Sequence, residues 1–175
     1  GGRAARTTAH AGKYYGSYET AIPANGKASN GRGIRNGPGI SVKLSALHAR
    51  YSRAQRARVM EELLPKVKAL LLLAKQYNIG FNIDAEETDR LELSLDLMEA
   101  LAFDTDLAGF DGIGYVVQAY QKRCPFALDF LIDLARRRGR KFMVRLVQGP
   151  YWDAACQRAQ VGAPGASLGC PRQGP

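Results

Sequence analysis

The feature that most constrains the fold is an alternation of short apolar runs with longer stretches of helical periodicity. Runs rich in Val, Ile and Phe occupy residues 39–47, 79–86, 112–120 and 141–147, and each predicts a buried strand. A dozen or more residues separate successive runs, which is the length that a helical crossover between parallel strands requires. The sequence therefore predicts an α/β fold on a parallel sheet.

The helices between these strands have recognisable boundaries. Ser52 and Gln55 have the spacing of a capping box ahead of an apolar-periodic helix that reaches Leu71, and Pro65 predicts a kink or a new start within it. A second helix is predicted over residues 90–103, and a third from Pro125 to just before Gly139. Near the start of the chain we predict a helix over residues 11–22. The glycines and proline of "GKASNGRGIRNGPG" then predict an irregular connection.

Two parallel-sheet architectures are open to such a chain. A dinucleotide-binding domain has its glycine-rich turn after the first strand, whereas "GRGIRNGPG" precedes a strand here. A (β/α)8 barrel has its functional residues at the carboxyl ends of the strands, and each predicted strand ends in a polar residue. The prediction is a partial barrel of about four of the eight strands, with the candidate site residues Lys43, Asp84, Gln118 and Arg145.

A side-chain period of two places these residues on one face of the sheet. On the same basis Ser41, Lys43 and Ser45 share a face. Lys43 suits carboxylate binding or Schiff-base chemistry, although a lysine can also extend outward into solvent. Asp84 could instead cap the next helix, as could Glu86 and Glu87.

The other two strand ends also have two interpretations each. Gln118 suits either a ligand contact or a structural hydrogen bond. Arg145 within a strand implies an anion, a carboxylate or an electron-rich ring as partner. Tyr151 and Trp152, which follow the fourth strand, suit a core position, a pocket wall or a stacking surface.

Composition and charge narrow the function classes. The net charge of +9 divides into a basic, an acidic and a basic third, and "RRRGRK" at residues 136–141 suits a helix C-terminus better than a nucleic-acid stripe. No apolar run approaches the ~20 residues of a membrane span, and no apolar leader opens the chain. The chain has three cysteines, so we expect reduced thiols and a cytoplasmic location. Because neither the cysteines nor the histidines have metal-type spacing, we expect no metal site, and surface or loop positions for His10 and His48.

Four segments carry a resemblance to a known family. They are "GISVKLSALHARYSRAQ", "YNIGFNIDAEETDRLELSLDLMEAL", "GIGYVVQAYQKRCPF" and "FMVRLVQGPYWD". In this order they resemble the proline dehydrogenase domain of the bifunctional proline utilization A flavoenzymes, from about residue 4 to residue 160. The resemblance implies a distorted (β/α)8 barrel that binds FAD, oxidises L-proline to Δ1-pyrroline-5-carboxylate and passes electrons to a membrane quinone.

The resemblance also implies roles for individual residues. Lys43 would hold the proline carboxylate with Asp84 in its charge network, and Tyr151 would wall the proline ring. Gln118 and Arg145 would contact the isoalloxazine, where positive charge favours the reduced anionic flavin. The backbone of Val147, Gln148 and Gly149 would meet the cofactor, with Trp152 against the adenine end.

The chain departs from the family in two ways. Gln148 and Pro150 stand where the family usually has Lys and Ala, which removes a cation, and possible backbone donation, beside the flavin. The remaining barrel strands, the paired arginines that clamp the substrate carboxylate and the aldehyde dehydrogenase domain are not in this sequence. We therefore expect a barrel portion at residues 1–160, a disordered Gly/Pro-rich tail at 161–175, and a fragment that is inactive in isolation.

Two alternatives remain open at this stage. One is a barrel lyase or aldolase that uses Lys43 as a Schiff-base nucleophile. The other is a basic remnant that binds nucleic acid or a partner chain, although we expect no nucleic-acid binding through this segment. For the intact enzyme we expect a cytoplasmic location at the periphery of the inner membrane.

Overall fold

The fold is centred on one sheet of four parallel strands. The computed structural model describes the backbone of residues 2–148 and the side chains of residues 14–148. The strands are β1 (Ile40–Val42), β2 (Phe81–Ile83), β3 (Ile113–Gln118) and β4 (Met143–Val147). They lie in the order β1-β2-β3-β4, and every neighbouring pair is parallel. The predicted α/β fold with sequentially added parallel strands is confirmed.

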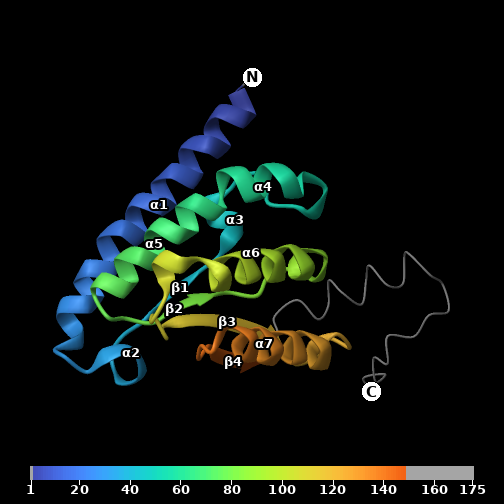
Figure 1. Cartoon of the computed structure of the whole chain (residues 1–175). Coiled ribbons are helices and arrows are strands. Elements are labelled where there is room, and N and C mark those ends of the chain that lie inside the picture. Colours follow the sequence, from blue (N-terminus) through green and yellow to red (C-terminus); the bar gives the residue numbers. More distant parts are fainter. Residues whose placement is uncertain (1, 149–175) are drawn as a thin grey trace, which may run out of the picture.

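Helices cover one face of this sheet. Those that follow the strands are α4 (Arg56–Glu62), α5 (Leu64–Gln76), α6 (Leu91–Phe103) and α7 (Cys124–Arg138). Figure 1 shows α5, α6 and α7 in successive positions along the sheet. On this face the strand residues Val42, Ile83, Tyr115 and Val117 are all buried, and they pack with helix residues into one hydrophobic core. Burial of this face holds the crossover helices against the sheet.

The predicted helix boundaries are confirmed at three positions. Pro65 lies in the first turn of α5, directly after α4 ends, so it starts a new helix because it has no N–H to donate. The helix predicted over residues 90–103 is α6, preceded by a 3-10 turn, η2 (Thr88–Arg90). Gly139 ends α7 in the left-handed conformation, with φ 57°. A further 3-10 turn, η3 (Thr105–Leu107), connects α6 to β3.

The first helix differs from the prediction. Helix α1 runs from Gly2 to Ser29 and includes Pro23, and the short helix α2 (Gly33–Asn36) follows it. The predicted irregular connection over residues 26–39 is therefore wrong for much of its length. Helix α1 lies alongside α5 (Figure 1), and Gly26 lets the two helices approach closely at Tyr77. Tertiary packing outweighs the low helix propensity of glycine and proline here.

The segment after β1 also differs from the prediction. The predicted strand 39–47 ends at Val42, and helix α3 (Leu44–Leu47) replaces its second half. Ser45 therefore does not share a strand face with Ser41 and Lys43. The predicted capping box does not form either, because Ser52 makes no side-chain cap at the 3-10 turn η1 (Arg53–Gln55) that precedes α4.

The basic run at the end of α7 interacts with α6 and the segment that follows it. Arg137 contacts Glu99 and Asp133, Arg138 donates to the backbone carbonyl of Ala102, and Arg140 donates to that of Asp104. These arginines thus satisfy acceptors at and beyond the C-terminal end of α6. None of the helices in the part of the chain that the structure describes is long and apolar enough to cross a membrane.

Candidate functional site

Three of the predicted site residues lie at one level across the sheet. Val42 pairs with Ile83, and the Asp84 N–H donates to the Val42 carbonyl at 2.9 Å, so Lys43 and Asp84 are the next residues at the carboxyl ends of β1 and β2. On the other side of the sheet, Arg145 of β4 pairs with Val116 of β3. Gln118 pairs with Val147, two residues further along. The predicted common level therefore holds for Lys43, Asp84 and Arg145 but not for Gln118.

Asp84 and Arg145 form an ion pair across β3. Arg145 Nη2 donates to Asp84 Oδ1 at 2.6 Å, on the face of the sheet opposite the helices. Asp84 is 21% exposed and Arg145 is 51% exposed. Because a guanidinium has five N–H donors in one plane, a single bond to Asp84 orients the group and leaves donors directed elsewhere. The pair therefore presents an oriented cation on the open face.

Lys43 is exposed and follows directly after β1, where it is the N-cap residue of α3. Its backbone N–H donates to the hydroxyl of Tyr18, which comes from α1. Burial, and then the negative charge of Asp84, raises the pKa of Tyr18. Tyr18 thus joins α1 to the strand ends near Lys43 and Asp84. The sequence does not distinguish Tyr18 from Tyr14 and Tyr15 beside it.

Gln118 is buried, with 3% exposure, and its amide is already bonded inside the protein. Its Nε2 donates to the backbone carbonyl of Glu86 at 3.1 Å, and its Oε1 accepts from Gln121 Nε2 at 2.5 Å. This arrangement matches the structural hydrogen-bonding role that the sequence left open. A contact between Gln118 and a cofactor stays a prediction.

Glu86 is the site residue whose importance the sequence did not reveal. Its side chain is only 5% exposed, and Arg90 Nη1 donates to its Oε2 at 2.6 Å. The Ser45 N–H donates to its Oε1 at 3.0 Å. Burial of a carboxyl group is costly unless it has such hydrogen-bond and ion-pair partners. An acidic residue three positions after β2 was the available signal, and it equally suited a helix cap.

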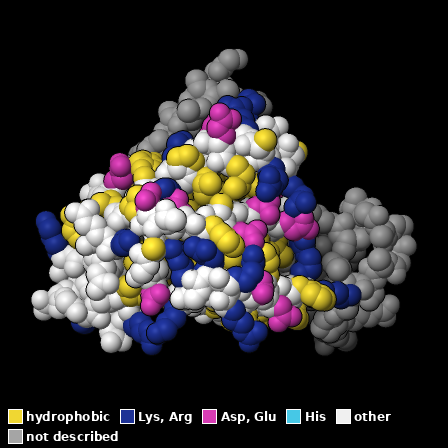
Figure 2. Space-filling view, viewed as in Figure 1, with side chains coloured by type: hydrophobic (Ala, Val, Ile, Leu, Met, Phe, Trp, Pro, Cys, Tyr) yellow, Lys and Arg dark blue, Asp and Glu magenta, His cyan; other side chains and the backbone are white. Residues whose placement is uncertain are grey.

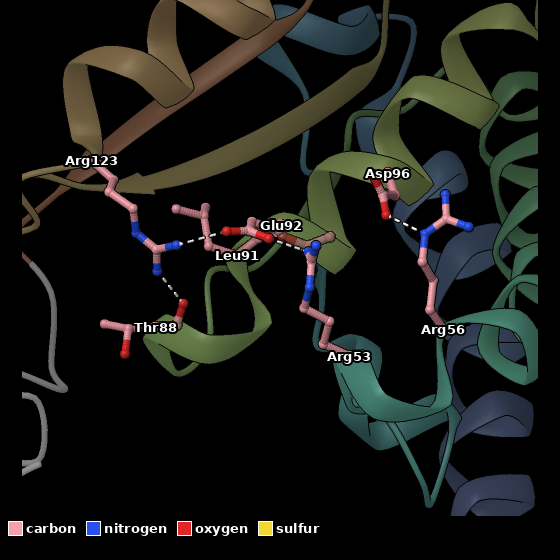
Figure 3. Close-up of polar contacts among 8 residues, drawn as sticks. Arg53, Arg56, Thr88, Leu91, Glu92, Asp96 and Arg123 are labelled. Carbon is pink, nitrogen blue, oxygen red and sulfur yellow. Dashed lines mark hydrogen bonds and ion pairs between the residues drawn. The ribbon is translucent and has the colours of Figure 1, made fainter. Parts of the chain in front are cut away.

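The loops that follow β1, β2 and β3 are joined by polar contacts on their outer side (Figure 3). Glu92 forms ion pairs with Arg53 of η1 and Arg123 before α7, and Arg123 also donates to the Thr88 carbonyl. Arg56 Nε contacts Asp96 Oδ2 at 2.6 Å. Because most of these side chains are about half exposed, each pair contributes about 1 kcal/mol or less. Together they hold neighbouring loops at the strand ends in contact.

Below the strand ends lies a small cavity of about 10 Å³, enough for one water molecule. Its lining includes Glu86, Ser94, Tyr115 and Gln118. The Ser94 and Tyr115 hydroxyls lie 2.5 Å apart, and burial raises the pKa of Tyr115 to about 12. The cavity is too small for an organic substrate.

Most of the other predicted site residues lie at or beyond the end of β4. Val147 is at the end of β4 and Gln148 is exposed, while Gly149, Tyr151 and Trp152 lie outside the described residues, as do Cys156 and Cys170. His48 has the predicted loop position, directly after α3, but it is not on the surface, because its side chain is 6% exposed and bonds Glu62 at 2.9 Å. Within residues 14–148, no group of three metal-ligating side chains could hold a metal ion.

Together these observations define a class: a portion of a parallel β/α barrel that presents a lysine and an aspartate directly after two strands and an arginine at the same level on a third. Comparisons with known proteins give the family. The proline dehydrogenase family model matches residues 1–165, and the chain belongs to this family.

Individual relatives support the same family. The chain is 66% identical over 160 residues to the bifunctional protein PutA of Klebsiella aerogenes and to that of Escherichia coli, covering 91% of this chain and 12% of each relative. It is 32% identical over 117 residues to proline dehydrogenase 1 of Bacillus subtilis, covering 66% of this chain and 32% of that protein. The chain therefore spans about one eighth of the length of the PutA relatives.

Solved structures show the same architecture. A crystal structure of a Bradyrhizobium japonicum proline utilization A mutant superposes with a TM-score of 0.86 at 50% identity, covering 89% of this chain and 16% of that one. A second, from Bdellovibrio bacteriovorus, superposes with a TM-score of 0.80 at 23% identity. The proline dehydrogenase domains of these neighbours are TIM barrels, and this chain corresponds to part of one.

The structure gives the two alternative functions no support. Schiff-base lysines are activated in desolvated pockets or beside other cations, whereas Lys43 is exposed. Figure 2 shows Lys and Arg side chains interspersed with Asp and Glu on the visible face, without the continuous basic surface of a nucleic-acid site.

Proposed function

We propose that this segment forms the part of an FAD-dependent proline dehydrogenase barrel that binds the substrate carboxylate and orients one arginine at the flavin. The observation that carries the proposal is that Lys43 and Asp84, directly after β1 and β2, lie at the same level of the sheet as Arg145 on β4, where Arg145 pairs with Asp84. In barrels this is the end where substrates bind. The reaction class is oxidation of L-proline to Δ1-pyrroline-5-carboxylate.

The described residues fit a flavin. On the open face of the sheet, Arg145 of β4 is half exposed and keeps guanidinium donors beyond the one that it gives to Asp84. This ion pair fixes the orientation of the guanidinium at the level of Val116, a buried residue of β3. Ring nitrogens and carbonyls accept hydrogen bonds from a guanidinium. When bound, FAD would supply the hydride acceptor for this oxidation, in which a C–N single bond of the proline ring becomes a C=N double bond as the carbon loses a hydride and the nitrogen a proton.

The residues of this chain would bind and orient. Lys43 supplies a cation for the proline carboxylate from a backbone position that Tyr18 and the start of α3 hold in place. Arg145 would hold the ring system, and its positive charge would favour the reduced anionic flavin. Asp84 keeps the guanidinium in the required plane. Val147 and Gln148 would contact the cofactor through their backbone.

A graft tests this proposal: the full-length Escherichia coli relative with its matching 160-residue segment replaced by that of this chain. We expect the graft to bind FAD and oxidise L-proline with a dye as acceptor. Lys43→Met should raise KM for proline by about 10-fold or more, the loss expected for one charge-assisted hydrogen bond. The matched control is Lys66→Met, an exposed lysine on α5. An equal KM in the parent graft and in Lys43→Met would contradict the proposal.

The same proposal includes the electron acceptor, the further domains and the cellular location of the full-length protein. A membrane quinone would accept the electrons, and the missing barrel strands and an aldehyde dehydrogenase domain would lie elsewhere in the full-length chain. The enzyme would be cytoplasmic and bind the inner membrane peripherally. Membrane vesicles that contain a quinone should therefore accept electrons from the graft when proline is added.

A further inference from the structure

We propose that Glu86 is a positioning residue that sets the place of Lys43 without touching the substrate, an inference that rests on the proposed function. Glu86 follows β2, yet its contacts reach the loops of both neighbouring strands. Its carboxylate accepts from Ser45 N–H after β1, and its backbone carbonyl accepts from Gln118 Nε2 at the end of β3. One residue therefore joins three strand ends.

The bond to Ser45 determines where Lys43 lies. Helix α3 has only four residues, and its N-cap Lys43 makes no side-chain capping bond. Ser45 is the second residue of that helix, so Glu86 supplies the acceptor that an N-cap side chain ordinarily provides. Without that acceptor, the first turn of α3 loses a partner for a backbone N–H. The backbone of Lys43, which begins this turn, then loses the restraint that the bond between Glu86 and Ser45 provides.

The carboxylate is itself held in place. Arg90 Nη1 lies 2.6 Å from Glu86 Oε2, and the Arg90 guanidinium carbon lies 5.6 Å from the centre of the Tyr51 ring. Tyr51 is buried, so Arg90 stacks on a fixed surface. With 5% exposure, Glu86 is screened little by solvent, in contrast to the half-exposed Glu92 on the outer side of the same loops.

The series Glu86→Gln and Glu86→Ala in the graft tests this role. Glutamine keeps an oxygen that can accept from Ser45, whereas alanine removes it. We expect Glu86→Ala to raise KM for proline by about 10-fold, with kcat within about 3-fold of the parent, and Glu86→Gln to lie between. The control is Glu92→Gln, which changes an exposed carboxylate with two arginine partners and should leave KM within about 2-fold.

A double-mutant cycle separates positioning from a general structural role. If Glu86 acts through Lys43, both Glu86 substitutions should change KM by less than about 2-fold in the Lys43→Met background. Equal effects of these substitutions in both backgrounds would overturn the proposal. An unchanged KM for proline in Glu86→Gln would also overturn the proposal. This variant provides the test if Glu86→Ala does not fold. Proline oxidation by the parent graft and the effect of Lys43→Met alone test the proposed function. A failure of the proposed function can therefore be distinguished from a failure of the inference about Glu86.

Discussion

Helix α1 contains two glycines at which the same substitution should have opposite effects. A Cβ at Gly26 would lie 2.7 Å from the Cβ of Tyr77, whereas a Cβ at Gly16 would meet nothing within 4 Å. Ordinary carbon–carbon contacts are about 3.5 to 4.0 Å, so Gly26→Ala must separate α1 from the end of α5 by about 1 Å. Gly16→Ala requires no movement.

The magnitudes follow from two competing effects. Replacing glycine by alanine inside a helix stabilises it by about 1 kcal/mol. Overpacking at a helix contact costs about 1 to 3 kcal/mol, since the Cβ of Tyr77 is fixed to its backbone. Gly16→Ala should therefore stabilise α1 by about 1 kcal/mol, and Gly26→Ala should destabilise it by about 1 kcal/mol. The two variants should differ by about 2 kcal/mol, roughly 30-fold in an opening equilibrium.

Native-state hydrogen exchange of the α1 amides in the graft measures this difference, because exchange rates report local opening. We expect slower exchange than the parent for Gly16→Ala and faster exchange for Gly26→Ala. Gly26→Ala should also raise KM for proline, because α1 carries the Tyr18 hydroxyl that accepts from Lys43. Equal protection of α1 in the two variants would show that Tyr77 does not limit the approach of the helices.

Three further predictions concern the cofactor, the isolated chain and pH. Gln148→Lys in the graft should lower the FAD dissociation constant, because it places a cation next to an anionic cofactor; equal constants for the two proteins would contradict this. The 175-residue chain alone should be colourless and should not reduce a dye with L-proline, since sheet edges that a closed barrel would pair are left open; a yellow, monodisperse and active preparation would contradict this. Tyr115 holds its proton to about pH 12 when folded but only to about pH 10.0 when unfolded, so stability falls as the pH rises through that window. Tyr115→Phe in the graft should reduce that fall, as measured by the free energy of unfolding at successive pH values through that window, and an equal fall in the two proteins would refute the assignment.

The sequence by itself determined the elements whose signals are local. Period-two runs of Val, Ile and Phe located all four strands, and helical periodicity with Pro65 and Gly139 located α5, α6 and the end of α7. The polar residues at the strand ends were visible for the same reason, because alternation assigns Lys43, Asp84 and Arg145 to one face once the sheet is known to be parallel. The motifs that resemble the family then indicated the chemistry of this face.

Only the tertiary structure decided which polar groups meet. The extension of α1 through Pro23 and Gly26 depends on a close approach to Tyr77, which is 51 residues away from Gly26 in the chain. Gln118 lies beyond the level of Arg145 because strand register is set by pairing between strands and not by the distance from a strand's end. The roles of Tyr18 and Glu86 arise from contacts with Lys43 and Ser45 on other elements. Such contacts leave no periodic pattern, because they depend on how separate elements pack together rather than on the local preference of either one.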